Sequence, residues 1–232
     1  MISPSRHAER YPPDAGTNVK LNLDRCSVVL AGAWNPAIFS PPWVAKRLFS
    51  STEMEVGLAF GDMLVLRFGT KDVELVVTSS SVQLRPRRVE QGVFDVVEDV
   101  AVRLLETLRE TPVRAFGINF GYDVEREGKP LKELVDLQRG RPARTTRISR
   151  SFEIGSESGR RGERAVMNVV LADPTDGALH LDFNEHHDAE PASGHAPGAR
   201  AAERLKGRVS RAREMAQEMA NELYELTEVT SG

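Results

Sequence analysis

The 232-residue sequence has one cysteine, few aromatic residues and no long apolar run. A single thiol excludes an intrachain disulfide, which is typical of proteins kept in a reducing compartment. No stretch approaches the roughly 18 apolar residues that a membrane-spanning helix requires. The first residues also lack the apolar core of a secretory signal peptide. We therefore expect a cytoplasmic protein that makes no contact with a membrane, with Cys26 buried and inert.

Motifs for catalysis and nucleotide binding are missing as well. The sequence contains no GxSxG element, no GxxxxGK[ST] or GxGxxG phosphate loop, no HExxH and no CxxC pair. The net charge is −3, so the whole chain has no electrostatic attraction to nucleic acid. The function we expect is therefore non-catalytic: a macromolecule-binding or assembly adaptor protein, without a cofactor, that binds itself as a homodimer and also an unidentified protein.

The segment Val93–Val124 is the one around which we expect the chain to be organised. Apolar residues recur at helical spacing over 93–110, and this predicts a central helix with one wide apolar face. Pro112 then ends the helix. Val113–Val124 alternates between large and small residues, which predicts a strand with one core face and one nearly flat face. The flat face would admit a helix or a second sheet, or alternatively a ligand or partner subunit.

Strand patterns occupy much of the remaining chain. The further predicted strands are Leu21–Trp34, Met54–Phe60, Met63–Phe68, Val73–Thr78, Val82–Arg85, Arg147–Ile154, Ala165–Leu171 and Ala178–Phe183. Further helices are expected at Ser40–Phe49, Leu131–Arg139 and Ala201–Thr227. Short turns favour antiparallel pairing. The predicted fold class is α+β, with antiparallel β-meanders each followed by a helix and the helices packed on one face of the sheet.

This pattern divides the chain into four regions. Residues 1–20 are polar and rich in proline, and we expect a flexible arm there. Residues 21–124 form the first β/α half, residues 125–145 a charged connector with a short helix, and residues 146–232 the second half. The two halves are expected to form one compact unit. In the first half, alternation should point Met54, Val56, Leu58 and Phe60 into the core.

Two apolar features are candidate partner-binding surfaces. The first is the aromatic stretch Trp34, Ile38, Phe39 and Trp43, which would either plug the end of the sheet or contact a partner. The second is a heptad seam in the C-terminal helix. The seam consists of Leu205, Val209, Ala212, Ala216, Met219, Leu223 and Leu226.

The charges of that helix bear on its partner. Its first turns are basic and its last turns acidic, which opposes the helix dipole. An antiparallel partner would offset this penalty. A second copy of the chain would do so in a homodimer, and an oppositely charged surface of the chain's own domain would do so internally.

Arginines are unevenly distributed, and nucleic-acid binding through them is the first alternative function. One group would share a hairpin surface, namely Arg144, Arg147, Arg150 and Arg161, with Arg160 and Arg164 close by. Another group consists of Arg85, Arg87 and Arg88. Phosphate contacts from such groups dominate nucleic-acid affinity. However, no aromatic residues alternate with the arginines, and a solvated charged face explains them equally well.

A metal-dependent enzyme is the second alternative. Four of the five histidines lie in Leu179–His195, and His180, Asp182, His186 and His187 are candidate ligands for a divalent metal. Their spacing matches no established metal motif. Adjacent strand residues also point to opposite faces, so His186 and His187 could bind one ion only if a loop bent them together. The competing explanation is a solvated polar loop.

Overall fold

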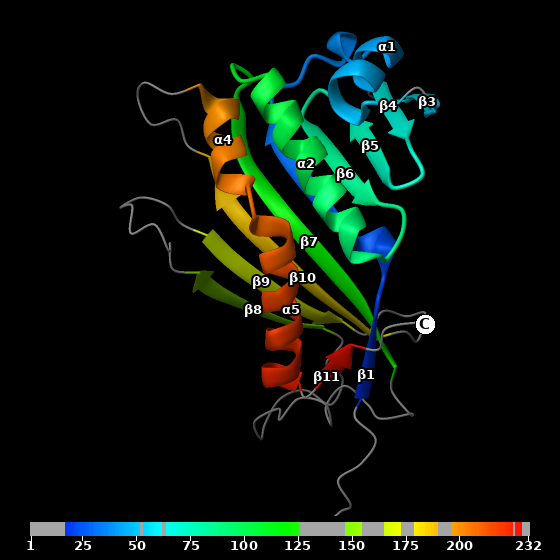
Figure 1. Cartoon of the computed structure of the whole chain (residues 1–232). Helices are drawn as coiled ribbons and strands as arrows, with labels where there is room; N and C mark the ends of the chain where they lie inside the picture. Colours follow the sequence, from blue (N-terminus) through cyan, green and yellow to red (C-terminus); the bar gives the residue numbers. More distant parts are fainter. Residues whose placement is uncertain are drawn as a thin grey trace, which may run out of the picture.

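The structure is a computed structural model that describes residues 17–51, 53–61, 64–125, 147–154, 165–172, 179–189, 196–224 and 226–228. These residues form an eleven-stranded sheet that is antiparallel except for one pair. Its main helices, α2 (Gln91–Thr107), α4 (Pro197–Leu205) and α5 (Arg208–Tyr224), lie together on one side of the sheet (Figure 1). The expected connector, 125–145, lies outside the described residues except for Glu125, as does its helix Leu131–Arg139.

The described residues contain eleven strands, of which those between residues 55 and 125 follow the predicted segments closely. The eleven are β1 (Thr17–Leu21), β2 (Ser27–Gly32), β3 (Glu55–Phe60), β4 (Leu64–Gly69), β5 (Val73–Val77), β6 (Ser81–Pro86), β7 (Val113–Glu125), β8 (Arg147–Ile154), β9 (Ala165–Ala172), β10 (Leu179–Asp188) and β11 (Leu226–Glu228). Shorter helical segments are η1 (Leu23–Arg25), η2 (Pro36–Ile38), α1 (Pro41–Val44) and the π-helical η3 (Ala45–Phe49).

Strand β7 joins the two parts of the sheet. The main strand order is β3-β4-β5-β6-β2-β7-β10-β9-β8, so β7 has β2 on one edge and β10 on the other. Its end also pairs with β1, from Leu21↔Tyr122 to Asn18↔Glu125. Residues 17–20 therefore belong to the sheet, and the prediction that the flexible arm reaches residue 20 is wrong for them.

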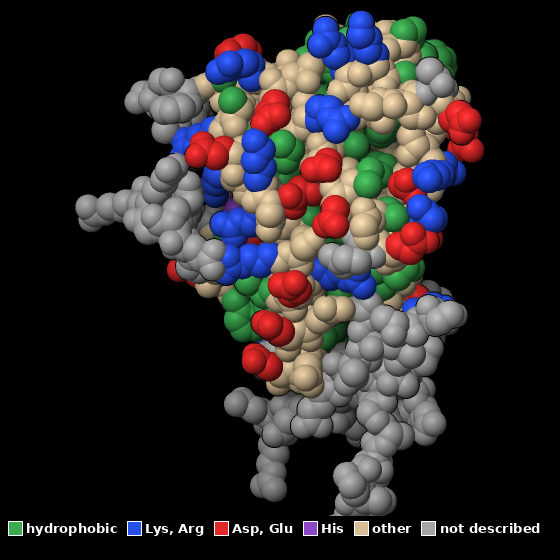
Figure 2. All heavy atoms as spheres, in the orientation of Figure 1, with side chains coloured by type: hydrophobic (Ala, Val, Ile, Leu, Met, Phe, Trp, Pro, Cys, Tyr) green, Lys and Arg blue, Asp and Glu red, His purple; other side chains and the backbone are tan. Residues whose placement is uncertain are grey.

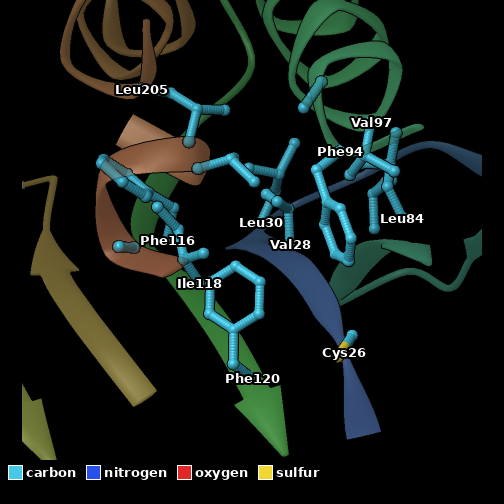
Figure 3. Close-up of a cluster of buried hydrophobic side chains, with 14 of the residues drawn as sticks. Cys26, Val28, Leu30, Leu84, Phe94, Val97, Phe116, Ile118, Phe120 and Leu205 are labelled. Carbon is cyan, nitrogen blue, oxygen red and sulfur yellow. The ribbon is translucent and has the colours of Figure 1, made fainter. Parts of the chain in front are cut away.

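The core lies between the sheet and the helical layer. Phe120 on β7 points toward Phe94 of α2, and Ile118 lies beside side chains of β2 (Figure 3). Phe116 lies on the side of Leu205 of α4 in the same cluster (Figure 3). The predicted faces of β7 are confirmed, because its large residues are all buried and pack in this core. Among the described residues no long helix packs on its small face, so the expected cover there is absent (Figure 1).

The predicted fold class, meanders each followed by its own helix, is wrong. The strands form one largely antiparallel sheet in which β2 is inserted between β6 and β7, far from its sequence neighbour β3. The helices form a shared layer, in which α2 packs against both α4 and α5. The physical reason is that β7 hydrogen-bonds to β2 along one edge and to β10 along the other, and this pairing joins β3-β4-β5-β6 and β8-β9-β10 into one sheet.

The single C-terminal helix expected at Ala201–Thr227 is also corrected. It is divided into α4 and α5 at Lys206 and Gly207, and Leu226–Glu228 form strand β11 rather than helix. Gly207 has φ +73°, a left-handed conformation that glycine adopts without a steric penalty. A heptad pattern alone does not reveal this break, because the apolar spacing continues across it.

Two strand boundaries differ as well. The predicted strand Leu21–Trp34 is interrupted by η1, in which Asn22 caps the turn by accepting from the Asp24 amide. The predicted strand Ala178–Phe183 continues to Asp188 as β10, because β7 and β9 pair with its polar second half. None of the helices that the structure describes is long and apolar enough to cross a bilayer.

Leu104 tests the role of α2 as a core element, because its side chain is fully buried between the helix and the sheet. We expect Leu104→Ala to lower the free energy of unfolding by about 2–5 kcal/mol, from lost transfer energy and the cavity left behind. Thr107→Ala, at an exposed position of the same helix, is the control and should change little. Urea denaturation measures both. An unchanged midpoint for Leu104→Ala would contradict the architecture.

Candidate functional site

The candidate metal ligands are separated by the strand that carries them. Side chains of β10 alternate, so His180, Asp182 and His186 lie on the helix-free face, whereas His187 lies under the helices. His180 and His186 are six residues apart on an extended strand, about 20 Å. Among the described residues no three His, Cys, Asp or Glu side chains converge in a way that could hold a metal ion. The structure therefore does not bring these four residues together.

His187 instead forms a buried polar pair. Its Nε2 lies 2.5 Å from Glu185 Oε1, and both side chains are at most 2% exposed. The imidazole stacks on Phe116, with ring centroids 4.4 Å apart. Arg208 of α5 reaches the same carboxylate oxygen at 3.7 Å. Because buried charges require partners, this cluster fixes α5 over β10 and has a structural role.

The helix-free face carries a ladder of amide side chains that runs across five adjacent strands. Ser27, Asn119, Asn184, Asn168 and Ser151 stand in register on β2, β7, β10, β9 and β8. Asn184 donates to Asn119 at 2.6 Å, Asn168 donates to Asn184 at 3.3 Å, and the two serines bond to the ends of the row. The sequence contained a signal for this ladder, because asparagine is rare in the middle of strands.

Next to the ladder lies a cluster of ion pairs. His180 Nδ1 is 2.8 Å from Asp123, and Asn22 donates to both oxygens of the same carboxylate. Arg25 extends over Gly121 and donates to both oxygens of Asp182 at 3.1 Å. Burial raises the pKa of the Asp182 carboxyl above its ordinary value, although Arg25 and His180 act in the opposite direction. The cluster ties η1 to the sheet.

The arginines proposed for nucleic acid are largely committed to carboxylates. Arg87 binds Glu55 at 3.1 Å, Arg88 binds Asp72 and Glu90, and Arg85 lies 3.8 Å from Glu74. Each of these ion pairs neutralises an arginine charge that would otherwise be available to bind a phosphate. Arg147 and Arg150 are exposed on β8. Arg144, Arg160, Arg161 and Arg164 lie outside the described residues, so the expected shared hairpin surface cannot be assembled from the described part of the chain.

The aromatic stretch forms a packed corner. Trp34 and Phe39 are buried, and Phe39 contacts Trp43 edge-on at 5.4 Å. The Trp34 indole donates to the Leu30 carbonyl at 3.1 Å. Ile38 is 37% exposed. These contacts correspond to the sheet-end plug, the first of the two explanations considered above.

The heptad seam is docked on the chain's own core. Leu205, Val209, Ala212 and Ala216 are buried there, and Met219 packs against it. Leu223 lies in α5 and Leu226 in β11, at positions whose side chains are outside the description. The seam therefore does not offer a dimer surface in the described part of the helix.

Helix α2 supplies the acidic partner that the basic start of α5 requires. Glu98 accepts from the backbone amides of Gly207 at 2.6 Å and Val209 at 2.8 Å, which satisfies donors that a helix start leaves unpaired. Lys206 bonds to Glu106 at 2.6 Å. In Figure 2, acidic and basic side chains alternate over this helical surface. The start of α5 thus finds its acidic partner within the chain, as one of the two sequence hypotheses proposed.

The surface that sequence reasoning missed is the β3–β4 hairpin. Val56, Leu58 and Phe60 do point to the helix-covered side, in register with Phe68, Leu66 and Leu64. However, the helices do not reach them, and their side chains are 53%, 56% and 79% exposed. A cleft of about 540 Å³ between η3, α2 and the Thr70–Asp72 turn marks where the cover ends. The expectation that these residues are core is therefore wrong, although the face they occupy was predicted correctly.

No protein family model matches the chain, and no curated protein is significantly similar to it.

Two carboxylate–histidine pairs on β10 contrast strongly in burial, and the buried one is also contacted by Arg208. Glu185–His187 is buried, whereas His186–Asp188 is 43% and 64% exposed. We expect Glu185→Ala to cost about 3–5 kcal/mol of unfolding free energy, because it leaves buried polar groups without a partner. Asp188→Ala should cost at most about 1 kcal/mol. Chemical denaturation of both variants measures the difference, and equal losses would contradict the buried pairing.

The raised pKa of Asp182 predicts that the stability of the folded chain depends on pH. Because its pKa is raised in the folded chain, that state binds the proton more tightly than the unfolded chain, so protonation favours folding. This contribution is lost as the pH rises through the folded pKa. The unfolding free energy of the wild type relative to Asp182→Asn should therefore increase as the pH falls from neutral toward the ordinary value of 3.8. Denaturation at several pH values measures this, and a constant or decreasing difference would refute it.

Proposed function

We propose that this protein is a non-catalytic assembly protein that binds a protein partner through the β3–β4 hairpin. The observation that carries the proposal is an apolar, core-type surface without a cover, formed by Val56, Leu58, Phe60 and Leu64. Exposed apolar side chains gathered in one place mark interaction sites more often than scattered ones do.

The hairpin is an edge of the sheet, which adds unpaired backbone groups to the apolar surface. β3 has β4 as its only neighbour in the strand order. Natural edge strands are usually protected from pairing by charges, proline or bulges. β3 contains no proline, and its one charge, Glu55, is paired with Arg87. An extended strand of a partner could therefore add to this edge, with backbone hydrogen bonds providing affinity and the apolar row providing specificity.

The opposite edge of the main strand order, β8, carries charged residues of the kind that protect an edge strand from pairing with another chain. Strand β8 presents Arg147, Arg150 and Glu153 as exposed charged residues. Charges along an edge oppose pairing with another chain because they would have to be desolvated. The contrast between the two edges supports β3 as the one available to a partner.

Site-specific photocross-linking tests the proposal. Phe60 is replaced by the near-isosteric p-benzoylphenylalanine in the full chain, which is irradiated in cells. We expect a covalent adduct with a protein, because position 60 is the most exposed apolar residue among those of the hairpin that the structure describes.

The matched control carries the same photoreactive residue at Glu218, an exposed position of α5 that lies away from β3 (Figure 1). This variant should give no comparable adduct. Absence of a protein adduct at position 60, or equal adducts at both positions, would overturn the proposal.

A further inference from the structure

We infer that the partner of the β3–β4 hairpin is a second copy of this chain, paired with it through β3 in antiparallel orientation. The inference rests on the proposed function and specifies its partner. The symmetry of β3 itself points to this partner. In a closed dimer each partner presents the same patch, so a strand that joins two copies must be complementary to its own reverse.

Strand β3 meets this condition in one register. With Leu58 on the two-fold axis, Leu58 faces the partner's Leu58, and Val56 faces the partner's Phe60. This is the register in which each of the three exposed side chains faces another of the three. Cross-strand apolar pairs of this kind are the unit of sheet stabilisation.

The charges of β3 and the residues on its other face are also compatible with this register. In the same register Glu55 faces the partner's Gly61, so the two copies bring no like charges opposite each other. Gly57 faces the partner's Ala59, and these small residues leave room on the helix-free side. A two-fold axis perpendicular to the sheet keeps both helical layers on the same side. The two exposed apolar rows then form one continuous surface in line with both cores.

Charge substitutions at Leu58 test this arrangement, because its side chain is 56% exposed and its replacement should not disturb the fold. Light scattering of the purified wild-type chain at micromolar concentration should give twice the chain mass. Leu58→Glu and Leu58→Lys should each give one chain mass, because each places like charges on the axis. An equal mixture of these two variants should regain twice the chain mass, with one copy of each. Circular dichroism confirms that both are folded.

Single cysteines then test the register. Leu58→Cys should form a covalent dimer on mild oxidation, because each residue 58 lies next to its symmetry mate. Val56→Cys is the matched control, with a similar exposure of 53% on the same face of the same strand. Its symmetry mate lies four residues away across the pair, so it should form no covalent dimer under the same oxidation. The native Cys26 is buried and common to both variants.

The outcomes separate this inference from the proposed function. A monomeric wild type, a mixture of the two charge variants that stays monomeric, or equal oxidation of both cysteine variants would overturn the inference. Masses above two chains would also overturn it, because they indicate open-ended association rather than a closed pair. If the purified chain is monomeric but position 60 cross-links to a different protein, the proposed function stands and the self-pairing is refuted. If position 60 gives no adduct, both are refuted.

Discussion

The pairing of β7 along both of its edges is the constraint on which the rest of the structure depends. Through it the strands before α2 and the strands after it become one sheet with a shared core side. The same strand provides large side chains to that core and small ones to the other face, so it fixes which side the helices cover. With β7 in place, α2, α4 and α5 have only one apolar surface on which to pack.

The helical layer is held to this surface by apolar contacts and by a small number of charged bonds. Glu98 binds the start of α5, and the Glu185–His187 pair with Arg208 anchors that helix over β10. The Glu185–His187 pair is buried and therefore costly to leave incomplete, so it specifies where α5 lies more than it adds to stability. The layer ends before the β3–β4 hairpin, and the exposed apolar surface there is a direct consequence of how far the helices extend.

In this arrangement the polar residues that first suggest metal or nucleic-acid binding are either separated from one another or already paired. The histidines of β10 are distributed over two faces, and the arginines after β6 are engaged by carboxylates. The amide ladder on the open face satisfies its members mutually. The edge strand β3 differs from these sites, because its three side chains Val56, Leu58 and Phe60 are apolar and more than half exposed. They would be core residues if a second layer or a second sheet covered them.

The sequence by itself determined the positions of strands β3 to β7, the central helix and the two faces of β7, because period-2 and period-3.6 patterns are local. It could not determine strand order, the break at Gly207 or the continuation of β10 through Glu185–Asp188, because these depend on partners distant in sequence. The seam of α5 predicted an apolar contact but not its partner, since a heptad pattern packs equally well on a second helix or on a sheet. Val56, Leu58 and Phe60 show the same limit. Their alternation determined the face on which they lie, but only the tertiary structure decided that the helical cover ends before it reaches them.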